Sequence, residues 1–407
     1  FTGILSGSYP AFYLSGFSPI KAIKGGTSGK RTGNVWIRRV LVGLQFAISI
    51  FMLIGTLIIY QQMQYVRGAD LGFDKDQVVS FQMNATTRDS WEALRNQLMQ
   101  NPNIINASTS SSIPGRGYGK NVMSVETNEG AIESYGIDAY GVDYEYFNVL
   151  DIEILEGRNI SKKYPTDTAS AVLVNEAMVN RMNWEDPIGK RFQFDQDSTK
   201  FHRVVGVVKD FHQNSLYNPI EALMFVPSLN NPNALVKVNG DLKEGLDYIQ
   251  ASWNELYPEI PLEYELLDQN FLEAYNEDQL RGRLFLGFAL MMIIISGLGL
   301  LGLASFTAEQ RTKEISVRKV LGANVNGLIF LLIKDFFWLI IFGAIPAFLI
   351  GYQIMNNWLN DFEYHITISA ISFVLVLIIV VFFVLLTTGF QAYKAANANP
   401  SKNLKYE

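Results

Sequence analysis

The sequence contains no cysteine, and its 407 residues include only three histidines, His202, His212 and His365. Without cysteine the chain has neither a disulfide scaffold nor a thiolate metal site, so any part outside the cytoplasm must be held together by packing alone. The histidines form no His-Glu-x-x-His pair, which argues against a membrane zinc protease. We therefore expect no metal centre.

Signals for nucleotide binding and for acid–base catalysis are equally sparse. The Gly-Lys pairs at residues 29–30 and 189–190 lack the upstream glycine and the following Ser or Thr of a phosphate-binding loop. Asp210 and His212 could work as an acid–base pair, but such a pair at a strand edge is more often hydrogen-bonded at the surface. We expect no catalytic residue, no bound cofactor and no nucleic-acid partner, so the energy for any work must come from another protein.

Apolar residues make up 49% of the chain and charged residues 18%, an apolar balance for a soluble protein. The apolar residues are concentrated in a few runs that are long enough to cross a hydrocarbon core about 30 Å thick. Residues 40–60 carry no formal charge and predict the first complete transmembrane helix. Three more crossings are predicted at residues 284–306, 336–355 and 368–390.

Residues 61–283 are rich in charges, turns and short alternating runs, which is typical of a folded domain outside the membrane. Runs of β-branched and aromatic residues predict strands, and Asn, Asp or Ser near the starts of other segments predicts helices. The mixture favours an α+β fold. Strands are predicted at 78–83, 122–126, 171–175, 203–208, 235–238 and 262–267, and helices at 90–100, 143–150, 176–182 and 242–256.

Within the predicted cytoplasmic segment at residues 307–335, the polar stretch 310–322 carries four cations, Arg311, Lys313, Arg318 and Lys319, against one acid, Glu314. Its charges place it on the cytoplasmic side by the positive-inside rule, and the i,i+4 spacing of Glu314 and Arg318 favours a helix. Apolar side chains recur along one face of that helix, and Gly322 suits a left-handed cap at its end. Such a helix either rests in the lipid headgroups or docks onto a cytosolic partner.

Two features concern the second crossing. The run from Asp268 is polar, favours helix and contains no proline, and if the helix is continuous from Asp268 to Gln310 it is about 60 Å long at roughly 1.5 Å per residue. It would form a stalk that joins the domain to the cytoplasmic segment. Small residues allow neighbouring helices to approach closely, and we predict such packing at Gly297, Gly299 and Gly302.

The remaining segments complete the predicted topology. Residues 1–39 read as the tail of a preceding transmembrane helix and a basic cytoplasmic loop, and residues 391–407 as a cytoplasmic tail. Residues 356–367 hold acids but no Lys or Arg, as an outside loop would. Residues 19–24 and 400–405 share proline, lysine and aliphatic positions, which points to an internal duplication if the match is not chance.

The layout of one crossing, a large domain and three crossings resembles the FtsX/MacB class of ABC transporter permeases, especially the long duplicated permeases of Bacteroidetes. Residues 311–323, Arg-Thr-Lys-Glu-Ile-Ser-Val-Arg-Lys-Val-Leu-Gly-Ala, are similar to the cytoplasmic signature of that family. Residues 9–24 look like the end of a preceding copy, so we expect this chain to be the C-terminal half. Stretches similar to a MacB-type periplasmic core domain occur at residues 155–158, 175–179, 186–192 and 206–212.

The resemblance implies a permease without a continuous substrate channel, in which the cycle of a separate ABC ATPase is passed through stalk helices to the domain. It implies the bacterial inner membrane as location, with the large domain on the periplasmic side. Further partners would be a second permease half or copy and an accessory protein of the periplasm or outer membrane. The coupling residues expected to contact the ATPase are Arg311, Lys313, Glu314, Ile315, Arg318, Lys319, Val320, Leu321 and Gly322.

A second class of function is a membrane-anchored sensor or scaffold whose outer domain binds a ligand or partner without an ATPase. A sensor usually carries a cytoplasmic output domain, and this sequence shows none. Copurification of a nucleotide-binding subunit with the intact chain would separate the two classes.

Overall fold

The computed structural model describes residues 32–116, 119–194, 200–321 and 323–396. The chain divides into two compact units, and each is described on its own. The membrane unit comprises Phe1–Leu53, Gly287–Ile350 and Phe373–Glu407, and the domain unit comprises Ile54–Leu286 and Gly351–Ser372. The predicted preceding helix and the repeated motifs at 19–24 and 400–405 lie outside the described residues.

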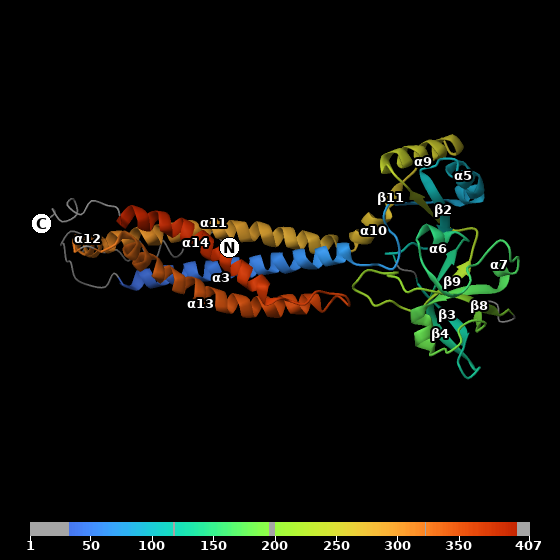
Figure 1. The fold of residues 1–407 in the computed structure, drawn as a ribbon, viewed down its shortest axis with the longest axis horizontal. Coiled ribbons are helices and arrows are strands. Elements are labelled where there is room, and N and C mark those ends of the chain that lie inside the picture. The colour runs from blue at the N-terminus through green and yellow to red at the C-terminus, as the bar shows by residue number, and fades with distance from the viewer. Residues whose placement is uncertain (1–31, 117–118, 195–199, 322, 397–407) are drawn as a thin grey trace, which may run out of the picture. The chain divides into compact units, whose positions relative to one another are not determined.

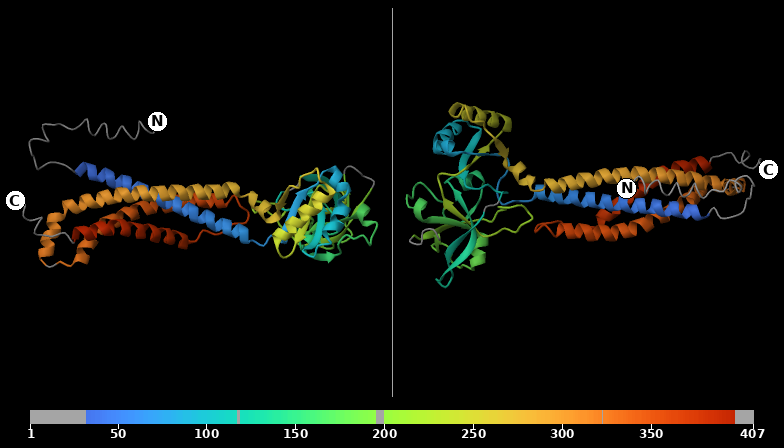
Figure 2. Two further views of the ribbon diagram at one scale, coloured as in Figure 1. Left: turned by 90° about the horizontal axis from the view of Figure 1, so that it is seen from above. Right: turned by 180° about the vertical axis from the view of Figure 1, so that it is seen from behind.

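Among the described residues, four helices are long and apolar enough to cross a membrane. They are α3 (Thr32–Gly68), α11 (Asn276–Gln310), α13 (Val325–Leu359) and α14 (Ala370–Ala396). Their apolar stretches are Arg38–Gly68, Asn276–Gln310, Phe336–Leu359 and Ala370–Lys394. The parts of these helices that belong to the membrane unit run alongside one another (Figures 1 and 2). The prediction of four membrane helices with a large α+β domain is confirmed.

The predicted continuous stalk helix is interrupted. A short helix α10 (Leu267–Glu273) ends before Tyr275, and α11 starts anew at Asn276. The side chain of Tyr275 is fully buried in the domain unit, and its hydroxyl accepts a hydrogen bond from the amide of Leu216 at 2.6 Å. The helix is therefore not continuous from Asp268, and the buried side chain of Tyr275 ties the chain to the domain at the break.

Within the described residues, the domain unit is built on an eleven-stranded mixed sheet in the order β11-β1-β10-β2-β4-β3-β7-β8-β6-β9, with β5 paired to β8. A further parallel pairing between β4 and β9 closes the strands from β4 to β9 into a ring. A single residue pair, Ser110 with Val142, joins β2 to β4, so the sheet has two parts that meet at one point. The strands are β1 (Val78–Gln82), β2 (Ile104–Ser110), β3 (Lys120–Glu126), β4 (Ile132–Val142), β5 (Ile154–Gly157), β6 (Ala171–Asn175), β7 (Arg191–Phe194), β8 (His202–Val208), β9 (Leu223–Pro227), β10 (Asn233–Val238) and β11 (Tyr264–Leu266).

Each part of the sheet has its own apolar core. The first core lies between β1, β2 and β10 and the helices α5 (Trp91–Leu98) and α9 (Leu242–Leu256), and it contains Trp253. The second core is enclosed by the ring of strands and by α8 (Glu176–Met182), and it contains Met178 and Phe192. Short helices α4 (Ala85–Asp89), α6 (Tyr146–Val149) and α7 (Asp167–Ser170) complete the domain.

Local sequence explains the elements that were predicted well. All residues of β6 are buried, and Asn175 at its end caps α8 by accepting a hydrogen bond from the amide of Met178 at 3.1 Å. Asp241 caps α9 in the same way through the amides of Lys243 and Glu244. The predicted bounds of β6, α8 and α9 are confirmed residue for residue.

Candidate functional site

The cationic segment forms α12 (Thr312–Val320), which follows α11 after a break at Arg311. The predicted i,i+4 ion pair is present, with Nη2 of Arg318 at 2.7 Å from Oε1 of Glu314. Both side chains of the pair are close to half exposed, so it supports the helix only weakly. Gly322 and the side chain of Lys313 lie outside the described residues.

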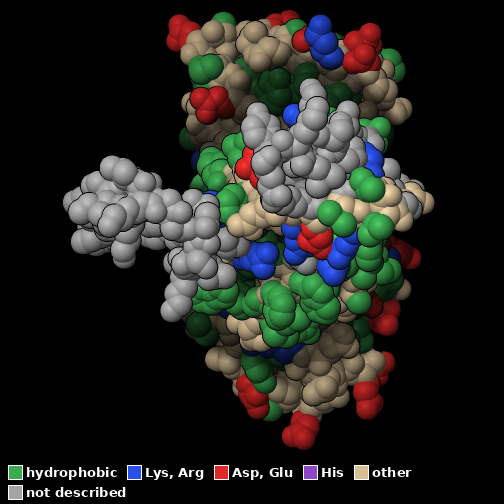
Figure 3. All heavy atoms as spheres, turned by 90° about the vertical axis from the view of Figure 1, so that its left-hand side faces the viewer, with side chains coloured by type: hydrophobic (Ala, Val, Ile, Leu, Met, Phe, Trp, Pro, Cys, Tyr) green, Lys and Arg blue, Asp and Glu red, His purple; other side chains and the backbone are tan. Residues whose placement is uncertain are grey.

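Three apolar side chains near the end of α12 are exposed. Val317 is 48%, Val320 67% and Leu321 80% exposed. Figure 3 faces the end of the membrane unit that carries α12, and Lys and Arg side chains lie beside hydrophobic ones there. Ile315 is only 3% exposed, which corrects the expectation that it contacts a partner. Its side chain is buried, whereas that of Val317 lies on the exposed apolar face of α12. We call Val317, Val320 and Leu321 the α12 apolar cluster.

The predicted packing glycines behave differently from one another. A Cβ atom at Gly297 would lie 2.8 Å from Cζ of Phe383 in α14, and one at Gly299 would lie 3.4 Å from Cγ2 of Val42 in α3. At Gly302 a Cβ would meet no described atom within 4 Å. Close packing against neighbouring helices is therefore found at Gly297 and Gly299, while Gly302 makes no such contact with the part of the chain that is described.

A second candidate site lies in the domain unit and was missed from the sequence. Residues 211–218, which we call the joint loop, have no helix or strand. Loops usually run over the surface, because a buried backbone needs partners for its polar groups. Half of this loop is nevertheless buried, namely Phe211, His212, Gln213 and Leu216.

Three hydrogen bonds join the joint loop to chain segments next to the membrane helices. The amide of His212 donates to the carbonyl of Leu71, in the segment after α3, at 2.8 Å. The amide of Leu216 donates to the Tyr275 hydroxyl just before α11, at 2.6 Å. The carbonyl of Leu216 accepts from the amide of Tyr364, between α13 and α14, at 3.2 Å. One loop is thus bonded to three separate connections.

Asp278, in the first turn of α11, links the joint loop to α13 by its carboxylate. The hydroxyl of Tyr217 donates to Oδ2, and the indole N–H of Trp358 in α13 donates to Oδ1 at 3.1 Å. Nη1 of Arg281 also donates to Oδ1, at 2.9 Å. The Asp278 side chain is 3% exposed, so all of its bonds are made inside the protein.

Aromatic rings surround this carboxylate. The ring of Tyr217 is stacked on Phe362 at a centroid distance of 4.1 Å and on Tyr275 at 5.5 Å. Trp358 meets Phe362 edge to face at 5.1 Å. Such ring pairs contribute about 0.5–1.5 kcal/mol each beyond the area they bury. We call Tyr217, Asp278, Trp358 and Phe362 the joint cluster.

Burial determines the charge states around the joint loop. It raises the pKa of Tyr217, whose hydrogen bond to Asp278 acts in the same direction. Burial also raises the pKa of Tyr275 to about 12. It lowers the pKa of His212, whose ring packs edge to face on Tyr364 at 4.7 Å. The two tyrosines and His212 are therefore neutral at neutral pH, and the tyrosines remain hydrogen-bond donors.

A glutamine of α3 is hydrogen-bonded to the α13–α14 connection. Nε2 of Gln62 donates to the carbonyl of Tyr364 at 3.1 Å, and Oε1 accepts from the amide of Ile366 at 3.0 Å. Gln62 is fully buried, and this pair of bonds holds the α13–α14 connection against α3. The sequence gives little signal for such a cluster, because its members are far apart in the chain and none belongs to a catalytic motif.

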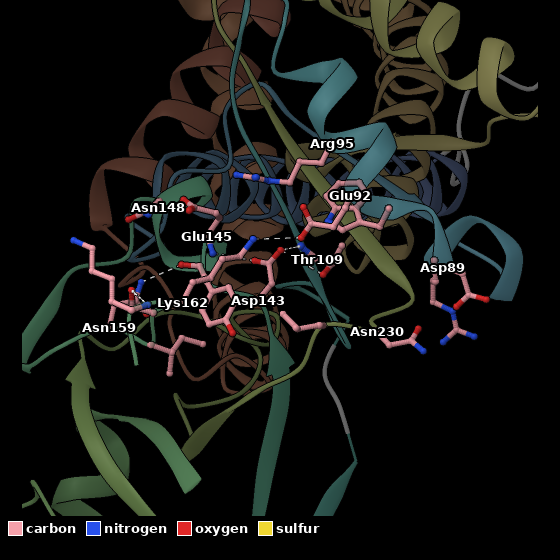
Figure 4. A pocket seen from close by; sticks show the side chains of 17 residues that line it. Asp89, Glu92, Arg95, Thr109, Asp143, Glu145, Asn148, Asn159, Lys162 and Asn230 are labelled. Atoms are coloured by element: carbon pink, nitrogen blue, oxygen red, sulfur yellow. Dashed lines mark hydrogen bonds and ion pairs between the residues drawn. The ribbon is translucent and has the colours of Figure 1, made fainter. Parts of the chain in front are cut away.

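A cavity of about 760 Å³ opens where the two parts of the sheet meet (Figure 4). Asp143 lies in its wall and accepts hydrogen bonds from the Ser108 hydroxyl at 2.5 Å and the Thr109 amide at 2.9 Å. Burial raises the pKa of Asp143. Side chains of both charges line the cavity, with Nζ of Lys162 at 3.5 Å from Oε1 of Glu92. Its size and mixed charge suit a small polar ligand.

Four membrane helices and an α/β domain inserted between the first and second of them define a multi-pass membrane protein with one large domain outside the bilayer. Residues 44–252 match the family model described as MacB-like periplasmic core domain, and residues 286–400 match FtsX-like permease C-terminal. The chain belongs to this family and is an ABC transporter permease of the FtsX/MacB type.

Relatives by sequence carry related names. The chain is 24% identical over 289 residues to the uncharacterized ABC transporter permease YvrN of Bacillus subtilis (strain 168), covering 66% of this chain and 70% of that protein. It is 24% identical over 199 residues to the macrolide export ATP-binding/permease protein MacB of Aggregatibacter actinomycetemcomitans, covering 46% and 30%. The MacB of Mannheimia succiniciproducens is 21% identical over 289 residues, covering 66% and 44%. The chain thus spans less than half the length of both MacB relatives.

Solved structures of related domains align over about half of the chain. The periplasmic region of MacB from Actinobacillus actinomycetemcomitans gives a TM-score of 0.37 at 16% identity, covering 50% of this chain and 95% of that one. The extracellular domain of the noncanonic ABC-type transporter YknZ from Gram-positive bacteria gives 0.33 at 15% identity, covering 46% and 98%.

Proposed function

We propose that this permease works with a separate ABC ATPase, which docks on α12 and drives the extracytoplasmic domain through the membrane helices. The observation that carries the proposal is the α12 apolar cluster. Exposed apolar side chains on an otherwise charged helix are favourable only when something covers them. A protein groove would bury the cluster, while Arg318 and Glu314 would remain at the rim of the interface.

The charges around the cluster support a cytosolic position for α12. Cations exceed acids in residues 311–319, as the positive-inside rule requires of a cytoplasmic segment. The domain then lies on the periplasmic side of a bacterial inner membrane. A second permease half or copy would complete the transporter, and an accessory protein of the periplasm or outer membrane would extend it.

Two variants of one residue test the docking. Leu321→Asp places a charge in the proposed groove, whereas Leu321→Met keeps an apolar side chain of similar size. Buried apolar anchors contribute more than about 1–2 kcal/mol each at an interface, so Leu321→Asp should reduce ATPase copurification at least tenfold. Leu321→Met should stay close to wild type, and so should Lys319→Ala, because charges at the rim affect mainly association rate and salt sensitivity.

The readouts are ATPase copurification and ATP turnover in the same detergent, with membrane insertion measured in parallel. Unchanged copurification with Leu321→Asp would refute the docking. Loss of membrane association by Leu321→Asp and Lys319→Ala alike, with no effect on the ATPase, would show that α12 rests in the lipid headgroups instead.

The cavity of Figure 4 favours a second function, a sensor or scaffold whose domain binds a polar ligand without an ATPase. The two functions differ in one observable. A permease of the first kind copurifies with a nucleotide-binding subunit when the intact chain is extracted from its own membrane, whereas a sensor does not.

A further inference from the structure

We propose that the joint cluster is the mechanical link through which movement of the helix ends reaches the sheet, with Asp278 as its central positioning residue. The functional meaning of this link rests on the proposed function, because an ATPase must supply the movement. The link itself is a property of the domain unit, and it can be tested without an ATPase.

Three connections between elements converge on the joint loop. The segment after α3, the break before α11 and the α13–α14 connection each place a hydrogen bond on residues 211–218. These bonds also satisfy a buried backbone that has no regular structure. A shift of any one of the three connections must therefore strain or break a bond of this loop.

The carboxylate of Asp278 is shared by three elements. Asp278 of α11 accepts from Tyr217 of the joint loop and from Trp358 of α13, so three separate elements meet at two oxygen atoms. Hydrogen bonds to a charged acceptor are stronger than neutral ones, and leaving a buried carboxylate without its donors is costly. The arrangement favours movement of the two helix ends and the loop as one body.

The joint loop also contacts the sheet directly. The loop follows β8, and its first residue, Phe211, packs against Phe225 of β9 with the ring centroids 6.0 Å apart. Gly72 lies against the start of the loop: a Cβ there would lie 2.5 Å from the carbonyl oxygen of Asp210 and 2.9 Å from Cα of Phe211, and its φ of +77° also favours glycine. A displaced joint loop therefore moves a side chain of the core.

A pair of substitutions in one helix tests the link in the full chain, embedded in lipid nanodiscs. Trp358→Phe keeps a ring beside Phe362 and removes the N–H that Asp278 accepts. Trp338→Phe is the matched control, because Trp338 also lies in α13 but is 61% exposed and contacts the ring of Phe342. Hydrogen exchange of the backbone amides is the readout.

We expect Trp358→Phe to raise exchange several-fold in the joint loop and measurably in Leu223–Pro227 of β9, although neither segment contains the substitution. Trp338→Phe should leave both segments unchanged. A change confined to α13 and the α13–α14 connection would overturn the proposal, because it would show that the contact is local and transmits nothing.

A second matched pair of variants tests the joint cluster by substitutions in the domain. Tyr217→Phe and Tyr248→Phe each remove one phenolic hydrogen bond, the first to Asp278 and the second to the carbonyl of Gln97 at 3.0 Å. Only Tyr217→Phe should raise exchange in the first turn of α11. Equal effects of the two variants there would contradict the link.

Different results would refute the link and the proposed function. If Trp358→Phe opens the joint loop but no ATPase binds the wild-type chain, the link stands and the proposed function fails. If an ATPase binds at α12 and Trp358→Phe leaves the joint loop and β9 unchanged, the proposed function stands and the link fails.

Discussion

Burial determines what single residues contribute in this protein more than residue type does. Ile315 and Val317 are both apolar residues of α12, yet one is buried and the other is available to a partner. His212 was expected to be hydrogen-bonded at the surface, and it is instead buried against Tyr364.

At His212, burial makes stability depend on pH. Burial lowers its pKa, and the attraction of Asp70 opposes this only in part. The unfolded chain takes up a proton near the ordinary histidine pKa of about 6.5, whereas the folded chain does not. The stabilising contribution is therefore complete above about pH 6.5 and is lost as the pH falls toward the lower folded pKa.

The measurement is thermal unfolding of the full chain in detergent between about pH 7.5 and pH 5.5. His212→Phe should lose less stability over this window than wild type. His365→Phe replaces an exposed histidine and should follow the wild-type curve. Identical curves for all three proteins would show that His212 is not held neutral by the fold.

The packing glycines give a second prediction for single residues. Gly297→Val forces a Cβ to within 2.8 Å of Phe383 Cζ, so we expect it to destabilise the membrane unit by about 1–3 kcal/mol. Gly302→Val makes the same chemical change where no described atom lies within 4 Å, and should stay within about 0.5 kcal/mol of wild type. Unfolding in one detergent compares the two, and equal losses would contradict the packing assignment.

At the scale of elements, local sequence signals were sufficient to predict a helix or strand where they agreed with the burial of its residues. The capped helices α8 and α9 and the fully buried β6 were predictable, because their caps and apolar patterns act within a few residues. β2, β4, β5, β7 and β9 were not predicted. β2 reads Ile-Ile-Asn-Ala-Ser-Thr-Ser and β4 contains two glycines, so their strand character comes from pairing with distant strands rather than from propensity.

The candidate sites likewise differ in whether local sequence could predict them. Polarity and spacing predicted α12 and its Glu314–Arg318 pair, which act locally. The joint cluster brings together Tyr217, Asp278 and Trp358, and no local pattern relates positions so far apart. The helix break at Tyr275 was missed for that reason too, since its cause is a contact with Leu216.

The two cores of the domain predict that it folds without the membrane helices. Residues 69–273 contain both apolar cores and all of the described strands. We expect this fragment to be soluble and to melt cooperatively, with faster amide exchange in the joint loop, which has lost Tyr275, Asp278 and Tyr364. Circular dichroism and hydrogen exchange check this, and a fragment that only aggregates would contradict the boundary.

At the scale of the whole molecule, the absence of cysteine allows a clean test of topology, because every labelled thiol belongs to the introduced site. Glu129→Cys lies on an exposed part of the domain, and Val320→Cys lies on the α12 apolar cluster. An impermeant thiol reagent should label the first in intact cells and the second only after permeabilisation. Labelling of Val320→Cys from outside would reverse the proposed orientation.

The central claim is that ATPase action at α12 reaches the joint loop. The most direct measurement is amide exchange of residues 211–218 in the permease–ATPase complex in nanodiscs, with and without ATP, for wild type and for Leu321→Asp. We predict an ATP-dependent change of exchange in wild type and none in Leu321→Asp. Exchange in wild type that does not respond to ATP, or an undiminished response in Leu321→Asp, would contradict the claim.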